Sequence, residues 1–298
     1  MNDASRAVLA LTNRLVGVGV PPLRASELWR VLDAVDDPGS LLGASAASVA
    51  STLGDGFDAA RLAALLDPGV ALAVRLDVLD ERGIWTVTPF DHGYPPGLRA
   101  RLGVAAPPVL YGAGFAGLLA EPGIGIVGAR AADPAAGSVA RAAAGVAAGA
   151  GESVVSGGSP GVDAAAMAGA LDAGGAVVNV MAEPLERVTS SAETRRQLLT
   201  RRLCAVTPYD PAAGYSVRNA KGRNKIIFGL SRLTLVVASG AGHDTTIDGA
   251  TEAHDHGYGP VVVWRGDGED AGNAALEAAG IAPLGDLSDL LPRASFER

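Results

Sequence analysis

The sequence predicts an α/β protein in which a Rossmann-like parallel sheet, with helices on both of its faces, follows a small all-helical module. Three observations support this prediction. Short runs of β-branched residues alternate with helical runs between Ile124 and Met181, as in parallel strands joined by right-handed crossovers. Glycine-rich turns follow two of these runs, at 128–130 and 156–161, where such sheets bind ligands. Leucines recur at helical spacing across residues 1–80, which indicates amphipathic helices.

The N-terminal module is expected to span residues 1–82, and no catalytic or ligand-binding pattern is visible in it. Its helices are expected at 5–16, 25–34, 44–53, 59–66 and 71–82, separated by turns that contain proline or glycine. Helix pairs of this kind can grip a DNA backbone. The pattern nevertheless favours a module whose function is packing.

The second domain is expected to span residues 83–292, followed by a loose tail at 293–298. Residues 83–89 predict an edge strand, because Pro89 ends the run and proline inside a sheet is largely confined to edges. Further strands are expected at 107–112, 124–127, 153–156, 176–181, 233–238 and 260–264. Helices are expected at 135–149, 164–171 and 194–203, from 219 onward, and at 250–256 and 271–280, with a polar turn at 240–249.

The two glycine patterns are not equally good evidence for a phosphate-binding loop. Residues 123–128 match G-x-G-x-x-G, but Gly123 and Gly125 precede or lie inside the strand, so this match is interpreted as false. The pattern Gly157-Gly158-x-x-Gly161 follows a strand and opens a helix, where bare backbone can approach a phosphate. The same residues are equally compatible with a tight turn in which Asp163 caps the helix.

Charge is distributed unevenly along the chain. The formal net charge is −8, yet residues 187–232 hold ten Arg and Lys against two acids, a local balance of +8, so the remainder carries −16. Such asymmetry is typical of a protein with an anionic partner. A solvated basic face is the alternative interpretation.

Other function classes find little support in the sequence. The single cysteine, Cys204, excludes an intrachain disulfide and suits a reducing, cytoplasmic location. We expect no signal peptide and no membrane span, since charges interrupt the N-terminal run and prolines break residues 103–120. His254 and His256 lie two apart on an expected helix and cannot share an ion, so no metal site is expected. Glu183, where a ribose-binding acid would lie, leaves nucleotide binding open.

Taken together, these motifs resemble the DNA-processing protein A (DprA/Smf) family. The matching pieces stand in family order along residues 70–290: Tyr94-Pro95, Pro107-Pro-Val-Leu-Tyr-Gly112, Ile126-Val-Gly-Ala-Arg130, Val155-Ser-Gly-Gly-Ser-Pro-Gly-Val-Asp163, Ala170-Leu-Asp-Ala-Gly-Gly175, Arg223-Asn-Lys-Ile-Ile227, Leu235-Val-Val237 and Gly272-Asn273. The chain departs from the family pattern at Met167, where a histidine is usual, and at Ala238-Ser239, where Glu-Ala is usual.

The resemblance implies a single-stranded DNA-binding protein, not an enzyme, which hands DNA to the recombinase RecA during natural transformation. It implies a homodimer and no cofactor. Carried over by position, the DNA site would contain Gly128, Arg130, Ser156, Gly157, Gly158, Gly161, Arg223, Asn224 and Lys225. Arg218 and Lys221 are near enough in sequence to join it.

An enzymatic alternative comes from residues 246–252, which resemble the Gly-Gly-x-Gly-Thr-x-x-Glu motif of the LOG phosphoribohydrolases. Those enzymes cleave nucleoside monophosphates with an arginine and a glutamate, and the corresponding residues would be Arg130 and Glu252. We expect Glu252 near the start of the helix at 250–256. Nucleotide binding without catalysis is a further alternative.

Overall fold

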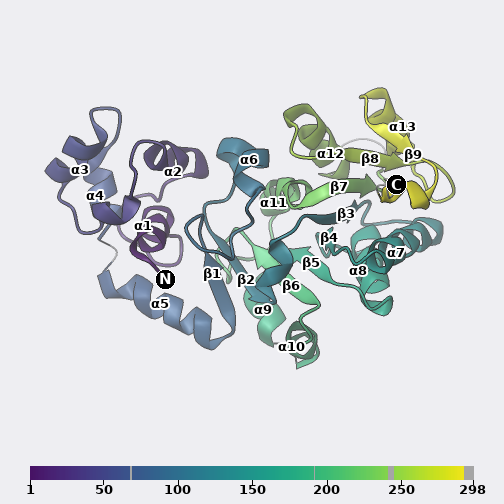
Figure 1. Cartoon of the computed structure of the whole chain (residues 1–298), viewed down its shortest axis with the longest axis horizontal. Helices are drawn as coiled ribbons and strands as arrows, with labels where there is room; N and C mark the ends of the chain where they lie inside the picture. The colour runs from purple at the N-terminus through teal and green to yellow at the C-terminus, as the bar shows by residue number, and fades with distance from the viewer. Residues whose placement is uncertain (68, 191, 241–244, 292–298) are drawn as a thin grey trace, which may run out of the picture.

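The computed structural model describes residues 1–67, 69–190, 192–240 and 245–291. In this part of the chain nine strands form one sheet, in the order β1-β2-β6-β5-β4-β3-β7-β8-β9 (Figure 1). The strands are β1 Ile84–Val87, β2 Leu110–Gly114, β3 Gly123–Val127, β4 Val154–Ser156, β5 Val177–Val180, β6 Leu203–Thr207, β7 Ser231–Val236, β8 Val261–Trp264 and β9 Ala282–Leu284. The tail expected at 293–298 lies outside the described residues.

The predicted parallel sheet is confirmed from β6 to β9, where all neighbouring strands run parallel. The first two strands differ, because β1 pairs antiparallel with β2 and β2 antiparallel with β6. An antiparallel edge on an otherwise parallel sheet is common in α/β folds. β1 lies at the edge of the sheet, as Pro89 predicted.

The strand order reverses at β3. From β3 the chain adds β4, β5 and β6 on one side, then crosses to the other side of β3 and adds β7, β8 and β9. In open α/β sheets a crevice forms at the carboxyl ends of the strands where the order reverses, and ligands bind there. The end of β3 is therefore the position that topology assigns to a ligand.

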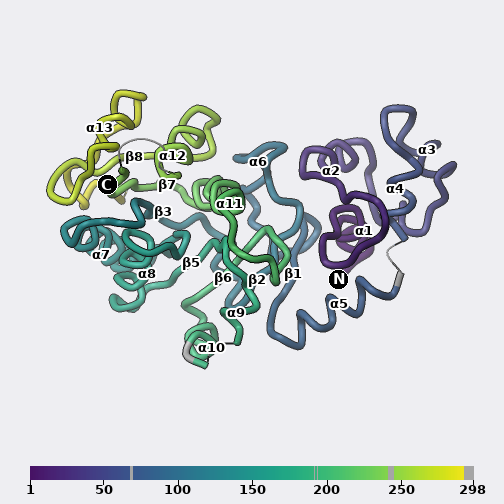
Figure 2. The backbone as a smooth tube through the Cα atoms, turned by 180° about the vertical axis from the view of Figure 1, so that it is seen from behind, coloured from purple at the N-terminus to yellow at the C-terminus, as the bar shows by residue number. Residues whose placement is uncertain are grey.

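Helices cover both faces of the sheet, as predicted (Figures 1 and 2). Consecutive strand residues alternate between two cores: Val127 and Val155 face one, Ile126 and Val154 the other. The first core is covered by α6 Leu98–Leu102, α11 Val217–Gly229, α12 Thr245–His256 and α13 Ala271–Ala278. The second is covered by α7 Pro134–Gly149 and α8 Val162–Asp172. No described helix is both long and apolar enough to cross a membrane.

Residues before β1 form the helical module that the leucine spacing predicted. Its helices are α1 Asp3–Thr12, α2 Ala25–Leu32, α3 Ala46–Leu53, α4 Ala59–Leu65 and α5 Gly69–Glu81. Its core continues onto the sheet through Tyr111 and Ala205. Trp29 Nε1 donates to the Ala106 carbonyl oxygen at 2.9 Å, and Arg75 pairs with Glu186 at 2.7 Å. The module is thus packed directly against the sheet.

Several elements differ from the sequence predictions. The helix expected at 194–203 is α10 Ala192–Leu199, which follows α9 Leu185–Ser190, and Leu203 begins strand β6. The helix expected at 250–256 begins at Thr245, so residues 245–249 are helical and not a polar turn. The short strand β9 had no prediction. No strand was expected at β6: its first residue, Leu203, was assigned to the preceding helix, and residues 204–207 had no prediction.

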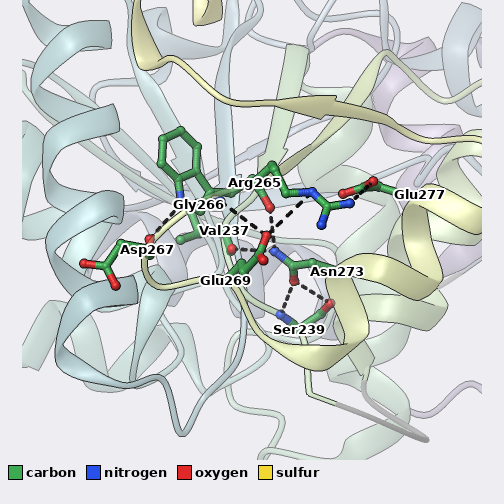
Figure 3. A network of polar contacts seen from close by, with 9 residues as sticks. Val237, Ser239, Arg265, Gly266, Asp267, Glu269, Asn273 and Glu277 are labelled. Carbon is green, nitrogen blue, oxygen red and sulfur yellow. Dashed lines mark hydrogen bonds and ion pairs between the residues drawn. The ribbon is translucent and has the colours of Figure 1, made fainter.

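A buried asparagine joins the carboxyl ends of β7 and β8 (Figure 3). Asn273 Nδ2 donates to the carbonyl oxygens of Val237 and Trp264, both at 2.9 Å. Its Oδ1 accepts from the Ser239 amide at 2.9 Å and from Ser239 Oγ at 3.0 Å. The side chain is 1% exposed and makes all four of these bonds without water. It fixes the position at which the chain leaves β7.

We expect Asn273→Ala to lower the free energy of unfolding by about 3 kcal/mol, because it leaves the Ser239 amide and two carbonyl oxygens buried without partners. Urea denaturation measures this loss. Glu269→Ala, on the exposed rim of the same network, is the control and should change stability by less than about 0.5 kcal/mol. Equal effects for the two variants would contradict the assigned role.

Candidate functional site

A polar pocket lies at the carboxyl end of β3, where the strand order reverses. It is lined by Val127, Gly128 and Arg130, by Ser159 and Asp163, by Ala220, Arg223, Asn224 and Phe228 of α11, and by Thr245 and Thr246 of α12. It contains about 420 Å³ of empty space, open solvent included.

Arg223 is the central side chain of this pocket. It projects from α11 and is 2% exposed. Its Nη2 donates to Ser159 Oγ at 3.3 Å, while its Nε has no hydrogen-bond partner among the described residues. The guanidinium lies directly over Gly157, where a Cβ atom would overlap it. Glycine at 157 is therefore required for the arginine to occupy this position.

Asp163 is the counter-charge to Arg223, and its predicted role as a helix cap is wrong. The N-cap of α8 is Gly161, and Asp163 lies in the first turn. Its carboxylate accepts from the backbone amides of Gly128 at 3.3 Å and Ser159 at 3.4 Å. Arg223 Nη1 lies 4.0 Å from Asp163 Oδ2. The buried aspartate thus joins the β3 turn, the glycine loop and α11.

Burial controls the titration of both members of this pair. Loss of solvent raises the pKa of Asp163 to about 6, although Arg223 and the backbone amides of Ser159, Gly128 and Gly157 act to lower it. Burial likewise lowers the pKa of Arg223, and the charge of Asp163 opposes that shift. At neutral pH the pair is therefore ionised, with an arginine charge that is largely compensated.

Arg130 lies at the rim of the pocket and is exposed. Its guanidinium carbon sits 5.1 Å from the centre of the Tyr215 ring, a cation–π contact. Gly161 has a φ of +85°, and a Cβ atom there would meet the carbonyl oxygens of Ala129 and Arg130. The glycine loop therefore packs against the Arg130 backbone, which confirms that the β3 and β4 turns are neighbours.

Three of the expected loop residues have structural roles. Ser156 is completely buried and its Oγ donates to the Ile126 carbonyl oxygen at 2.7 Å, so it does not line the pocket. Gly158 has a φ of +68° and lies against Asn179 of β5. Gly128 does line the pocket, and Val162 and the Ala238 carbonyl leave no room for a Cβ atom there.

The polar residues of α11 point in different directions. Asn224 lines the pocket and donates to the Thr245 carbonyl oxygen at 3.1 Å. Lys221 and Lys225 instead pair with acids of α12, Asp248 at 2.8 Å and Glu252 at 3.2 Å. Arg218 lies outside the pocket. Of the expected cations, Arg130 and Arg223 are the two that the structure brings together here.

Glu252 does not lie where a catalytic carboxylate is needed. Because α12 begins at Thr245, Glu252 is in the middle of the helix and not near its start. Its Oε1 accepts from Lys225 and from Tyr258 Oη at 3.3 Å. It is absent from the pocket lining, so the structure separates it from Arg130.

The basic segment 187–232 does not form one face with the glycine loop, contrary to the expectation from its charge. Arg201 and Arg202 precede β6, and Arg232 pairs with Glu152 at 3.1 Å beside the start of β4. These positions lie at the amino ends of the parallel strands, opposite to the pocket. Among the described residues of the segment, α11 and the preceding Tyr215 adjoin the candidate site.

Sequence reasoning missed three groups of pocket residues. Ser159 was included only as part of the loop, Asp163 was assigned a different role, and Thr245 and Thr246 were placed in a turn. A signal for Asp163 existed in the sequence. Asp163 and Arg223 both belong to the matched motifs, and an acid and an arginine in such motifs suggest a buried ion pair. The threonines gave no comparable signal.

Comparison with known proteins identifies relatives of this arrangement. The family model described as DNA recombination-mediator protein A matches residues 85–283. The structure is similar to that of DNA processing protein A from Streptococcus pneumoniae, with a TM-score of 0.73 and 21% identity over 100% of this chain and 99% of that one. It is also similar to DNA processing protein A from Helicobacter pylori, described for its single-stranded DNA binding mode, with a TM-score of 0.55 and 18% identity over 69% and 93% of the two chains. No curated protein sequence matches.

We expect Gly157→Ala to displace the Arg223 guanidinium and to lower the free energy of unfolding by about 2 kcal/mol, as overpacking of a buried site does. Gly145→Ala is the matched control. Gly145 lies inside α7 with open space around its Cα, so alanine there should be neutral or stabilise by about 0.5 kcal/mol. Urea denaturation of both variants measures whether each substitution lowers or raises the free energy of unfolding. A neutral result at 157 would contradict the close packing.

The Asp163 pKa predicts a pH effect on stability. A carboxyl whose pKa rises from 3.8 unfolded to about 6 folded binds its proton more tightly in the folded state, so protonation stabilises the fold. The free energy of unfolding of the wild type, relative to Asp163→Asn, should therefore rise by about 1.4 kcal/mol as pH falls from about 7.5 to about 5. If the stability difference between the wild type and Asp163→Asn stays constant or falls as pH falls, the charge of Arg223, and not burial, dominates the pKa of Asp163.

Proposed function

This chain belongs to the DNA recombination-mediator protein A family, and from that premise we propose that it binds single-stranded DNA at the pocket over β3. The observation that carries the proposal is the arginine pair at the point where the strand order reverses. Arg223 is fixed in the floor of the pocket and Arg130 stands exposed at its rim. Phosphate groups are the ligands that such a pair recognises.

The two arginines divide the work of binding a phosphate. Arg130 is exposed and its guanidinium can make a bidentate pair with phosphate oxygens. Arg223, whose charge Asp163 largely compensates, holds a guanidinium in a fixed position in the pocket floor beneath it. The backbone amides of Gly128 and Ser159 already donate to Asp163, so the glycine loop does not act as an open phosphate cradle. Its function is to hold Arg223.

The start of α12 adds to the attraction for an anion. Thr245 and Thr246 are its first two residues and both line the pocket. The positive end of the helix dipole therefore faces the phosphate site. Tyr215, which is 43% exposed beside Arg130, offers a ring on which a base can stack. Stacking of this kind has little sequence preference.

We propose a binding protein and not a phosphoribohydrolase. The pocket carboxylate, Asp163, is held by Arg223 and three backbone amides, and Glu252 is paired with Lys225 and does not line the pocket. Delivery of the strand to RecA, a role in transformation, a homodimer and a cytoplasmic location belong to the same proposal and rest on family resemblance.

The test is single-strand binding at several salt concentrations. A site that contacts about four phosphates should give a log–log salt slope near −3, and Arg130→Ala should flatten it by about 0.7. Arg130→Lys should also weaken binding, because lysine does not reproduce the bidentate geometry. Arg141→Ala, an exposed arginine that pairs with Asp172 away from the pocket, should leave the slope unchanged.

Duplex DNA of equal length is the comparison ligand. The acidic remainder of the chain repels a duplex over a wide surface, while a narrower single strand can follow the pocket and its rim. Tighter binding to duplex, or a slope near zero for the wild type, would contradict the proposed function.

A further inference from the structure

A second and larger cleft separates the helical module from the sheet domain. It contains about 1310 Å³ of empty space, open solvent included. One wall comes from the module and includes Arg14, just after α1. The other comes from the sheet domain and includes Tyr209 and Arg218. This space is far larger than the pocket over β3.

The cleft has unpaired positive charge on both walls. Arg14 and Arg218 are exposed, and neither has an ion pair with any described residue. The other charged groups of the lining have partners. Lys225 pairs with Glu252 at 3.2 Å, and Asp210 lies 3.9 Å from Arg75. The two arginines are therefore the cations that remain available to an anionic ligand.

Helix α11 is shared by the cleft and the pocket. Arg223 and Asn224 face the pocket, whereas Arg218 and Gly222 face the cleft. Arg218 and Arg223 are five residues apart, about 7.5 Å along the helix axis. Between the pocket rim and Arg218 lie Tyr215 and Val217, both exposed. A flexible chain can therefore pass from Arg130 over the start of α11 into the cleft.

We propose that this cleft is the second segment of the single-stranded DNA track, in which Arg14 and Arg218, on opposite walls, each bind one phosphate. The inference rests on the proposed function and extends it to the helical module. Tyr209 lines the same cleft, and its hydroxyl donates to the Asn219 carbonyl oxygen at 2.8 Å, which fixes the ring against α11. A fixed aromatic ring and separated cations suit a strand whose bases are unpaired.

Oligonucleotide length tests the proposal. Fluorescent oligo-dT of about four nucleotides is long enough to place a phosphate at the pocket, while about sixteen nucleotides extend into the cleft. The double variant Arg14→Ala/Arg218→Ala should bind the short oligonucleotide like the wild type. For the long one its salt slope should be flatter by about 1.4, so the affinity ratio between about 50 and 200 mM salt should fall about sevenfold.

Arg30→Ala is the matched control, because Arg30 is an exposed arginine of the same module that lies outside the cleft. It should bind both oligonucleotides like the wild type. Thermal unfolding checks that all variants remain folded, which is expected since no described residue hydrogen-bonds to Arg14 or Arg218.

The outcomes separate the two proposals. If the wild type binds neither oligonucleotide, the proposed function fails and the inference fails with it. If the wild type binds both and the double variant matches Arg30→Ala on the long one, the cleft is not part of the track and the proposed function stands. A labelled acidic peptide could bind the wild type and not the double variant, while both bind the long oligonucleotide equally. That result would assign the cleft to a protein partner and overturn the inference.

Discussion

The packing of the Arg223 guanidinium on Gly157 is the constraint on which the site depends. A buried arginine is costly to desolvate, and removal of one member of a buried ion pair typically costs about 3–5 kcal/mol. Here the arginine is balanced by Asp163, which in turn binds the amides of Gly128 and Ser159. One charge thus fixes the turn after β3, the loop after β4 and the position of α11. The contact between Arg223 and Gly157 therefore maintains the shape of the glycine loop without a bound ligand.

Local patterns were sufficient to predict most of the fold. The five module helices and the core from β3 to β5 follow from periodicity and glycine turns, which are properties of neighbouring residues. β6 escaped because its five residues follow two arginines that extend a helical pattern. The antiparallel placement of β2 escaped for another reason. Its partner β6 is far along the chain, and pairing across that distance leaves no local trace.

The site was predictable in its centre and not at its edges. Arg130, Gly157 and Arg223 belong to the motifs that carry the family resemblance, and the resemblance implied them. Lys221 and Lys225 have the same composition signal, yet each is paired with an acid 27 residues later in sequence. Such pairs arise when α11 packs on α12, and this packing is decided by the tertiary fold. Formal charge along a sequence therefore overstates the charge available to a ligand.

The antiparallel strands β1 and β2 have a consequence for how the helical module moves. The chain passes from α5 straight into β1, which is hydrogen-bonded through β2 into the same sheet as β3. A module attached in this way is not joined to the sheet domain by a flexible linker. The distance between the helical module and α11 is therefore fixed when the protein folds. The entropy cost of positioning the two walls of the cleft is met during folding and not when a ligand binds. Preorganised surfaces bind with less ordering cost, and encounter with a partner should need no domain closure.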